Sequence, residues 1–354
     1  MNVQDTFRKW QSLQPLTREQ EYLLSKKFTI EYNYNSNHIE GNTLTYGQTE
    51  LLLLFGITSK EGHVKDFADM KASQVGMEMV SEAVHDRSMP LTQNFIRQLH
   101  KIILREDYVE YRNLPGGKTI CYTIHAGQYK SRPNSVITRY GDRFEYASPE
   151  ETPALMTELV DWYNAAEREG KLSPVELAAL FHYRYIRIHP FEDGNGRIAR
   201  LMVNYILARH GWPMVVVRSR CKEEYLEALH KSDMNVGLEP ARGANATILQ
   251  IRHFLKYFTR MVDEEIKYNI GIVEKYGEDV WWFDGQELKF RSPNNGKMMR
   301  LMKANPCITY RQMSEALGIN SSAMQKLLEG LRKKGYIERR DDSWYVYAIT
   351  TKKD

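Results

Sequence analysis

Cysteine and long apolar runs are both scarce in this sequence, and each shortage excludes a class of protein. The 354 residues contain three cysteines, Cys121, Cys221 and Cys307, too few and too far apart for a disulfide framework or a Cys-rich zinc module. No apolar run approaches the roughly 18–20 residues that cross a bilayer, and the first residues lack the apolar core of a signal peptide. We therefore expect a cytoplasmic protein with no membrane partner.

The distribution of charge predicts a separate C-terminal module. The whole chain has 49 Lys and Arg against 45 Asp and Glu, a net charge of +4. Residues 291–354 alone carry 13 basic and 6 acidic residues, so the rest of the chain is slightly acidic. The length and the ordinary proportions of apolar (42%) and charged (27%) residues fit two or three globular domains.

Most of the chain has the periodicity of helices, so we predict a mainly α protein. Capping boxes at Ser148 and at Ser173, each followed by Pro and by Glu three residues later, predict two helix starts, the second helix ending near Ile188. Residues 114–134 are predicted to be a loop, and the alternating residues around Gly141 a β-hairpin over 135–147. Further helices are expected over residues 66–84, 92–105, 197–210, 223–231 and 247–269.

The stretch HPFEDGNGRIAR, residues 189–200, has the features of a phosphate site. Gly194 and Gly196 stand directly before a helix, where backbone N–H groups and the helix dipole favour an anion. Arg197 and Arg200 share one helix face, so two guanidinium groups reach the same anion, as a triphosphate requires. His189 is suited to proton transfer near neutral pH, and Asp193 to holding a Mg²⁺ that bridges phosphate oxygens.

Competing interpretations of this stretch are weaker. Taken alone, a His at a helix end or a Gly-Asn-Gly turn is usually structural. A zinc site needs further His or Cys ligands near His189 and Asp193, and the P-loop pattern GxxxxGK[ST] is absent. Eight specified positions within twelve residues make a chance match negligible.

These residues resemble the Fic-family signature HxFx[D/E]GN[G/K]RxxR at every fixed position, and the resemblance extends over about residues 91–258. It implies a helical core with a β-hairpin flap, and transfer of AMP from ATP to a protein hydroxyl. By position, it implies that His189 deprotonates the acceptor and that Asp193 holds Mg²⁺. It also implies that the nucleotide phosphates are bound by Gly194, Asn195, Gly196, Arg197 and Arg200.

A second motif, SNHIEG, resembles the inhibitory signature of the same family. Ser36 and Glu40 lie four residues apart, hence on one helix face, and Gly41 is suited to ending that helix. Glu40 is then expected to pair with Arg200 and to take the place of the γ-phosphate. A Glu at a helix end is more often simply solvated, and the full signature elsewhere in the chain favours the inhibitory role.

The resemblance also suggests substrate contacts. The flap, with Val136, Ile137 and Thr138, offers an edge to which an extended protein segment adds as a strand, the alternative being a surface hairpin without a partner. Tyr225 occupies a place where the family encloses the adenine, although Glu224 stands where many relatives have a second aromatic residue. A role of Tyr225 in the core is an equal alternative.

The last part of the chain has the pattern of a winged helix. A capping box at Thr309 opens a helix that ends at Gly318, residues 321–334 form a second helix, and two strands flank Asp341 and Asp342. Basic side chains make DNA a candidate partner: Lys326, Arg332, Lys333, Lys334, Arg339 and Arg340. Ser321, Ser322 and Gln325 are the side chains expected to reach base edges. Such modules also serve as dimer or protein-docking elements.

We therefore predict four regions. They are an N-terminal helical region with the inhibitory helix (1–90), a Fic catalytic domain (91–276), a linker (277–296) and a winged helix (297–354). The leading hypothesis is an autoinhibited, Mg²⁺-dependent protein adenylyltransferase that acts on another protein or on itself, and we expect a homodimer. The alternatives are another phosphoryl-type transferase, a nucleotide-sensing transcriptional regulator, and removal of AMP from a modified protein.

Overall fold

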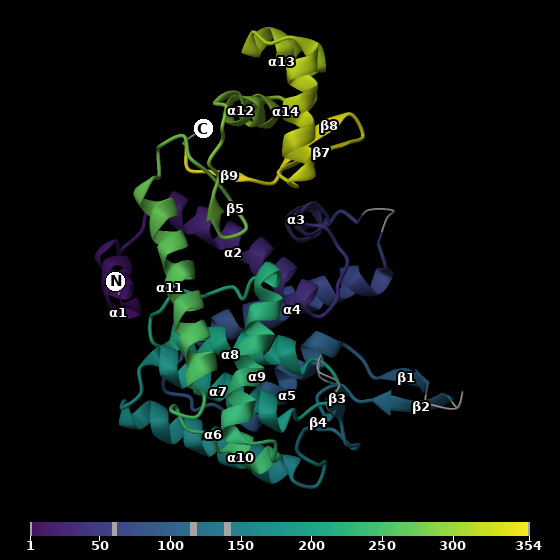
Figure 1. Ribbon diagram of the computed structural model, residues 1–354, viewed down its shortest axis with the longest axis vertical. Helices are drawn as coiled ribbons and strands as arrows, with labels where there is room; N and C mark the ends of the chain where they lie inside the picture. The colour runs from purple at the N-terminus through teal and green to yellow at the C-terminus, as the bar shows by residue number, and fades with distance from the viewer. Residues whose placement is uncertain (1, 59–61, 114–118, 138–142, 353–354) are drawn as a thin grey trace.

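The computed structural model describes residues 2–58, 62–113, 119–137 and 143–352, and it is mainly helical (Figure 1). The first helices are α1 (Val3–Ser12), α2 (Arg18–Ile39), α3 (Tyr46–Phe55), α4 (Val64–Ala83) and α5 (Gln93–Leu104). Two antiparallel hairpins follow, β1 (Tyr108–Asn113) with β2 (Thr119–Ile124) and β3 (Ser135–Ile137) with β4 (Arg143–Glu145). The next helices are α6 (Thr152–Glu169), α7 (Pro174–Ile188), α8 (Asn195–Arg209), η1 (Ser219–Cys221), α9 (Lys222–Val236), α10 (Pro240–Ala244) and α11 (Arg252–Glu274).

Helix α7 lies at the centre of the main core. Its N-cap Ser173 forms the predicted capping box with Glu176. The predicted buried face is confirmed, since none of Leu177, Phe181 and Ile188 is more than 2% exposed. Packing on several sides by α6, α8, α10 and α11 makes α7 a rigid support for the loop that follows it.

Several element boundaries differ from the sequence prediction, among them the end of α9 at Val236 rather than 231, and two of the differences have a local cause. The capping-box hydrogen bonds of Ser148 form, but a turn intervenes and regular α6 begins at Thr152. The last long helix begins at Arg252 rather than 247, because Thr247 and Gln250 close a capped turn before it.

The prediction of a loop over residues 114–134 was wrong in part. The segment Thr119–Ile124 is strand β2, which pairs with β1 from Tyr108↔Ile124 to Asn113↔Thr119. Both strands are rich in Tyr, Val, Ile and Thr, so the β signal was present, but the intervening Gly and Pro outweighed it in the prediction. The hairpin over 135–147 is confirmed by β3 and β4, although its turn lies outside the described residues.

The C-terminal part contains β5 (Trp281–Phe283), β6 (Gln286–Glu287), α12 (Asn294–Ala304), α13 (Tyr310–Leu317), α14 (Ser321–Lys333), β7 (Ile337–Arg340), β8 (Ser343–Val346) and β9 (Ile349–Thr350). The winged-helix prediction is confirmed: Thr309 caps α13, Gly318 ends it, and Asp341 and Asp342 form the β7–β8 turn with positive φ. Strands β5 and β6 lie in the segment predicted to be a linker. They form a three-stranded sheet with β9, which ties the start of the module to its end.

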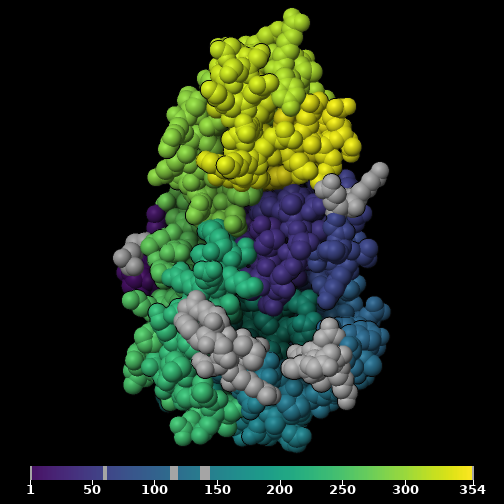
Figure 2. Space-filling view, turned by 45° about the vertical axis from the view of Figure 1, so that its right-hand side comes forward, coloured from purple at the N-terminus to yellow at the C-terminus, as the bar shows by residue number. Residues whose placement is uncertain are grey.

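Helix α2 lies between the two halves of the molecule, with the C-terminal elements above it and α6–α10 below it in the view of Figure 1. Figure 2 shows the C-terminal module stacked directly on the N-terminal helices. Side chains of α2 bond both ways: Asn35 donates to Asp284 of the β5–β6 turn (2.8 Å), and Ser36 accepts from Arg200 of α8 (3.0 Å). No helix in the described part of the chain is both long and apolar enough to span a bilayer.

Candidate active site

The loop between α7 and α8 is held in one shape by its own side chains. Gly194 caps α8 with φ +78°, a conformation that a residue with a Cβ rarely adopts. The Asn195 side chain accepts from the Phe191 N–H (3.0 Å) and donates to the Phe191 carbonyl (2.7 Å). Phe191 is buried and stacks on His100, with ring centroids 3.7 Å apart. The Phe191 ring thus anchors the loop in the core, and Asn195 uses both polar atoms of its side chain to shape the loop.

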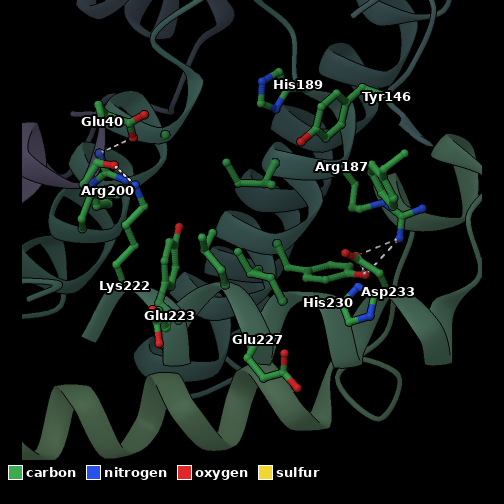
Figure 3. Close-up of a pocket in the computed structure, with 18 residues that line it drawn as sticks. Glu40, Tyr146, Arg187, His189, Arg200, Lys222, Glu223, Glu227, His230 and Asp233 are labelled. Atoms are coloured by element: carbon green, nitrogen blue, oxygen red, sulfur yellow. Dashed lines mark hydrogen bonds and ion pairs between the residues drawn. The ribbon is translucent and has the colours of Figure 1, made fainter. Parts of the chain in front are cut away.

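His189 ends α7 in the left-handed conformation, with φ 51°. Its ring stacks on Tyr146, with centroids 3.9 Å apart, and lines a cavity of about 590 Å³ (Figure 3). Burial and the nearby charge of Lys130 lower the pKa of His189 to about 3. The imidazole is therefore neutral at physiological pH, and within the described part of the chain its Nδ1 has no hydrogen-bond partner. A neutral imidazole is the form that accepts a proton.

Asp193 lies just before the start of α8 and is held by three neighbours. Tyr108 donates to its Oδ2 (2.9 Å), Arg197 pairs with the same atom (3.3 Å), and the Gly194 N–H donates to its Oδ1 (2.6 Å). Burial alone raises the pKa of Asp193, but Arg197 and the two donors outweigh it, so the net pKa lies below its ordinary value. The carboxylate is ionised and its side chain is 40% exposed.

Arg200, one turn into α8, is bound by the C-terminal end of α2. Its Nη2 pairs with Glu40 Oε1 (2.7 Å) and donates to the Ser36 carbonyl (2.8 Å), while Nε donates to Ser36 Oγ (3.0 Å). Ser36, within α2, and Glu40, its C-cap residue, thus reach the same guanidinium. Helix α2 ends at Ile39, and Gly41 follows with φ +95°. The ion pair is charge-assisted and half-buried, because Arg200 is 2% exposed whereas the Glu40 side chain is 41% exposed.

Gly196 leaves the space that Glu40 occupies. A Cβ built on Gly196 would collide with Oε1 of Glu40 and approach Nη1 of Arg200 to 3.2 Å. A residue larger than glycine at this position is therefore incompatible with the Glu40–Arg200 pair as it stands.

The cavity extends from Arg200 to a second arginine (Figure 3). Arg187 of α7 is 1% exposed and bonds to Tyr183 Oη (3.0 Å), to Asp233 Oδ1 (3.2 Å) and to two backbone carbonyls of the α9–α10 connection. Lys222, at the start of α9, lines the same cavity and donates to the last carbonyl of α2, on Ile39 (2.6 Å). Sequence reasoning missed four lining residues: Tyr146, Arg187, Lys222 and Asp233. Arg187 stands two residues before His189 but outside the motif, and the other three are more than 20 residues from the motif.

Tyr225 both borders the cavity and packs in the core, the two environments that the sequence suggested for it. It lines the cavity, yet it is 4% exposed and packs near Phe254 and Tyr257. Its hydroxyl lies 2.9 Å from His182 Nε2, and burial raises its pKa to about 12. Glu224, the neighbour that departs from the family pattern, forms an ion pair with exposed Arg260 and does not line the cavity.

The flap borders the cavity through β4 and the residues after it, because Phe144 and Tyr146 belong to the lining. The backbones of Val136 and Ile137 pair with Phe144 and Arg143. Thr138, and the side chains of Val136 and Ile137, lie outside the described residues.

Several basic side chains of α14 and the residues after it are exposed: Lys326, Arg332, Lys333 and Lys334. The two wing arginines differ, since Arg339 pairs with Asp342 (3.1 Å) and Arg340 with Glu338 (2.9 Å). Ser321, Ser322 and Gln325 on the first turns of α14 are exposed. The positive surface thus belongs to α14 rather than to the wing.

Comparison with known proteins agrees with this geometry. Residues 90–207 match the Fic/DOC family model, and residues 291–338 match a winged helix-turn-helix DNA-binding model. The crystal structure of a Fic domain containing signaling protein from Bacteroides thetaiotaomicron is 52% identical, with a TM-score of 0.72, over 77% of this chain and 97% of that one. A Fic family protein from Desulfovibrio desulfuricans shares the fold along 97% of this chain and 93% of its own, with a TM-score of 0.55 at 17% identity.

The region shared with the curated relatives makes up a larger share of this chain than of each relative. Protein adenylyltransferase fic-1 of Caenorhabditis elegans is 27% identical over 70% of this chain and 42% of its own length. Protein adenylyltransferase Fic of Nematostella vectensis is 27% identical over 68% of this chain and 48% of its own. The chain therefore spans less than half the length of these relatives.

Proposed function

The chain belongs to the Fic family, and from that premise we propose that it is an autoinhibited protein adenylyltransferase, which moves AMP from ATP to a Ser, Thr or Tyr hydroxyl of a protein. One observation carries the proposal: a neutral His189 and the Glu40-bound Arg200 line the same cavity beside the N-terminus of α8. A pocket that binds nucleotide without catalysing a reaction does not need a neutral base beside an anion site.

The chemistry follows from the positions of the side chains. The first N–H groups of α8 and the guanidinium groups of Arg197 and Arg200 bind the phosphates. His189 accepts the proton of the acceptor hydroxyl as its oxygen bonds to the α-phosphorus. The bond from the α-phosphorus to the bridging oxygen breaks, and pyrophosphate leaves with both electrons. Most of the rate enhancement comes from alignment and charge stabilisation.

The residues present fit a magnesium ion held together with the nucleotide. Within the described segments no cluster of three or more His, Cys, Asp or Glu side chains forms, so a metal held by protein ligands alone has no support there. Mg²⁺ commonly takes one carboxylate plus phosphate oxygens and water, and Asp193 offers an ionised, partly exposed carboxylate. When bound there, the ion would neutralise phosphate charge.

Autoinhibition rests on the occupation of Arg200. A carboxylate at 2.7 Å takes the guanidinium that a γ-phosphate requires, so ATP binds poorly or with its α-phosphate out of line. Gly196 suits the inhibited arrangement, because a side chain at this position would collide with Glu40.

The proposed partners follow from the same site. The acceptor is a protein segment that adds to the flap as an extended strand and presents its hydroxyl to His189. We propose a cytoplasmic location, which suits the free thiols of Cys121, Cys221 and Cys307. We also propose a homodimer, as is common among family members with N-terminal inhibition, and sedimentation analysis tests it.

Mass spectrometry of the purified protein after incubation with ATP and Mg²⁺ tests the proposed activity. The comparison needs wild type, Glu40→Gly, and Glu40→Gly combined with His189→Ala. We expect an added AMP on Glu40→Gly and none on the double variant. Unmodified Glu40→Gly protein, also when offered a cell lysate as acceptor, would reject the transferase.

DNA binding by the C-terminal module is a second candidate function, favoured by the exposed basic face of α14 and by the match to a DNA-binding model. We expect duplex DNA to bind with an affinity that falls steeply with salt. Lys326→Gln is expected to weaken binding, and exchange of the Glu338-paired Arg340 for Gln to weaken it less. Absence of any mobility shift at low salt would leave protein docking as the role of the module.

A further inference from the structure

The segment from Lys130 to Asn134, which leads into the flap, is bonded to the catalytic loop along its length. The Lys130 N–H donates to the Pro190 carbonyl (2.9 Å), and Asn134 Nδ2 donates to the Phe191 carbonyl (3.0 Å). The flap and the loop that carries the base are therefore one connected unit.

Lys130 makes the central contacts of this unit. Its ammonium donates to the carbonyls of Ile188 (3.0 Å) and His189 (2.9 Å) and to Oδ1 of Asn134 (2.9 Å). Three acceptors match the three N–H groups of an ammonium, and the residue is 4% exposed. A lysine buried to this degree without a bonded carboxylate is costly, so its retention needs a reason.

The backbone conformation of His189 explains why a buried lysine is retained at position 130. A non-glycine residue at φ 51° is strained by about 1–2 kcal/mol relative to a right-handed helix, so some contact must hold it there. Lys130 binds the two carbonyls on either side of the Cα of His189, and this turn directs the imidazole onto Tyr146 and into the cavity.

The ammonium also acts on the imidazole through its charge. Burial and then Lys130 lower the pKa of His189, whereas the backbone of Ile186 and then Asp193 oppose them. Tyr146 stacks on the ring, and Arg187, Arg200 and Glu40 line the same cavity. Burial lowers the pKa of Lys130 itself to about 7, with Glu151 opposing.

We propose that Lys130 is a positioning residue for His189: it fixes the left-handed turn of the base and couples acceptor docking on the flap to the base. The inference rests on the proposed transferase function. The role proposed for Lys130 differs from a purely structural one because it requires the positive charge of the side chain and not only its packing.

Initial rates of self-modification with α-labelled ATP test it, in the Glu40→Gly background with Lys130→Met and Lys130→Arg added. We expect Lys130→Met to lower kcat by about 100-fold, since small misplacements of a base cost that much, with the KM for ATP within about twofold. Loss of the charge raises the pKa of His189, so the acid limb of the pH–rate profile moves to higher pH. Lys130→Arg keeps the charge and most of kcat, and its alkaline limb moves from near pH 7 to higher pH.

A titration of the histidine ring signals by NMR, with His189→Ala for assignment, adds a readout that needs no activity. The pKa of His189 is expected to rise in Lys130→Met and to stay unchanged in Lys130→Arg. An unchanged pKa in Lys130→Met, or an alkaline limb that persists near pH 7 in Lys130→Arg, would overturn the inference. If the Glu40→Gly parent transfers no AMP, the proposed function fails, and the titration alone decides the role of Lys130.

Discussion

The guanidinium of Arg200 binds both a carboxylate and a hydroxyl at the C-terminal end of α2, so the proposed inhibition can be tested in steps. Nη2 carries the ion pair with Glu40, and Nε carries the bond to Ser36 Oγ. A buried charged donor loses more when its carboxylate is removed than when a neutral acceptor is removed.

We therefore expect graded release of AMP transfer. Ser36→Ala removes one neutral bond and should raise the rate about tenfold or less, an effect of about 1.4 kcal/mol or below. Glu40→Gln keeps an oxygen near Arg200 without the charge and should fall between Ser36→Ala and Glu40→Gly. The measurement is the rate of AMP incorporation, and a Ser36→Ala rate equal to that of Glu40→Gly would contradict the order.

Two further buried histidines lie behind the site. His100 is fully buried, and its Nδ1 accepts from the Gly127 N–H (2.8 Å), so this nitrogen carries no proton. Burial lowers the pKa of His100 to about 4 and that of His182 to about 3. Because the folded chain keeps both rings neutral, the unfolded chain binds more protons between these values and about 6.5.

Stability should consequently fall as the pH drops below about 6.5, by up to about 1.4 kcal/mol per pH unit for each buried histidine, and level off below the folded pKa values. Urea unfolding at pH 7.5 and 5.5 measures the loss. His182→Gln should reduce the difference between the two pH values, while the same exchange at exposed His85 should not. Equal acid sensitivity in both variants would assign the effect to other groups.

Strand β1 brings a hydroxyl to the proposed metal ligand. Tyr108 donates to Asp193 from the first position of β1, while Tyr111 of the same strand is 68% exposed. Groups that orient a metal ligand typically change affinity by about 10-fold or more when removed. Tyr108 and Tyr111 lie on the same strand, so substituting each in turn tests whether the bond to Asp193 affects metal binding.

Tyr108→Phe is expected to weaken Mn²⁺ binding by about 10-fold in the presence of a non-hydrolysable ATP analogue, because Asp193 loses a donor that holds its rotamer. Electron paramagnetic resonance of free Mn²⁺ reports this directly in the Glu40→Gly background, without turnover. Tyr111→Phe is the matched control and should leave the affinity unchanged. Equal affinities in all three proteins would show that Arg197 and Gly194 suffice to orient Asp193.

The sequence predicted the local signals well and the long-range contacts poorly. Capping boxes located α7 and α13, and the turn at Asp341 located the wing, because these patterns depend on neighbours within four residues. Ser36, Glu40 and Arg200 were matched across 160 residues only because a family pattern linked them. Lys130 and Asp284 carry no local signature, and their roles arise from partners that folding brings together from distant parts of the chain.

Helix α2 is held by both halves of the protein through one buried ionic cluster. Arg218 binds Glu265 of α11 (2.7 Å), Glu31 of α2 (2.9 Å) and Asp284 of the β5–β6 turn (3.0 Å). Asp284 also accepts from Asn35, the residue before Ser36. The turn that opens the C-terminal module thus bonds to α2 one turn away from Glu40.

Asp284→Asn should therefore loosen the C-terminal end of α2, which carries the proposed inhibitory contact, as well as lower the stability of the protein. The exchange removes a charge facing Arg218 and Arg220, and we expect unfolding to become easier by about 1–3 kcal/mol. We also expect basal AMP transfer to rise several-fold, yet to stay below that of Glu40→Gly, because Arg200 keeps its own partners. Asp279→Asn is the control, since Asp279 pairs with Arg300 within the C-terminal part and makes no bond to α2. A loss of stability in Asp284→Asn without any rise in activity would mean that the packing of α2 against α3, α4, α8 and α11 holds it in place without the bond to Asp284.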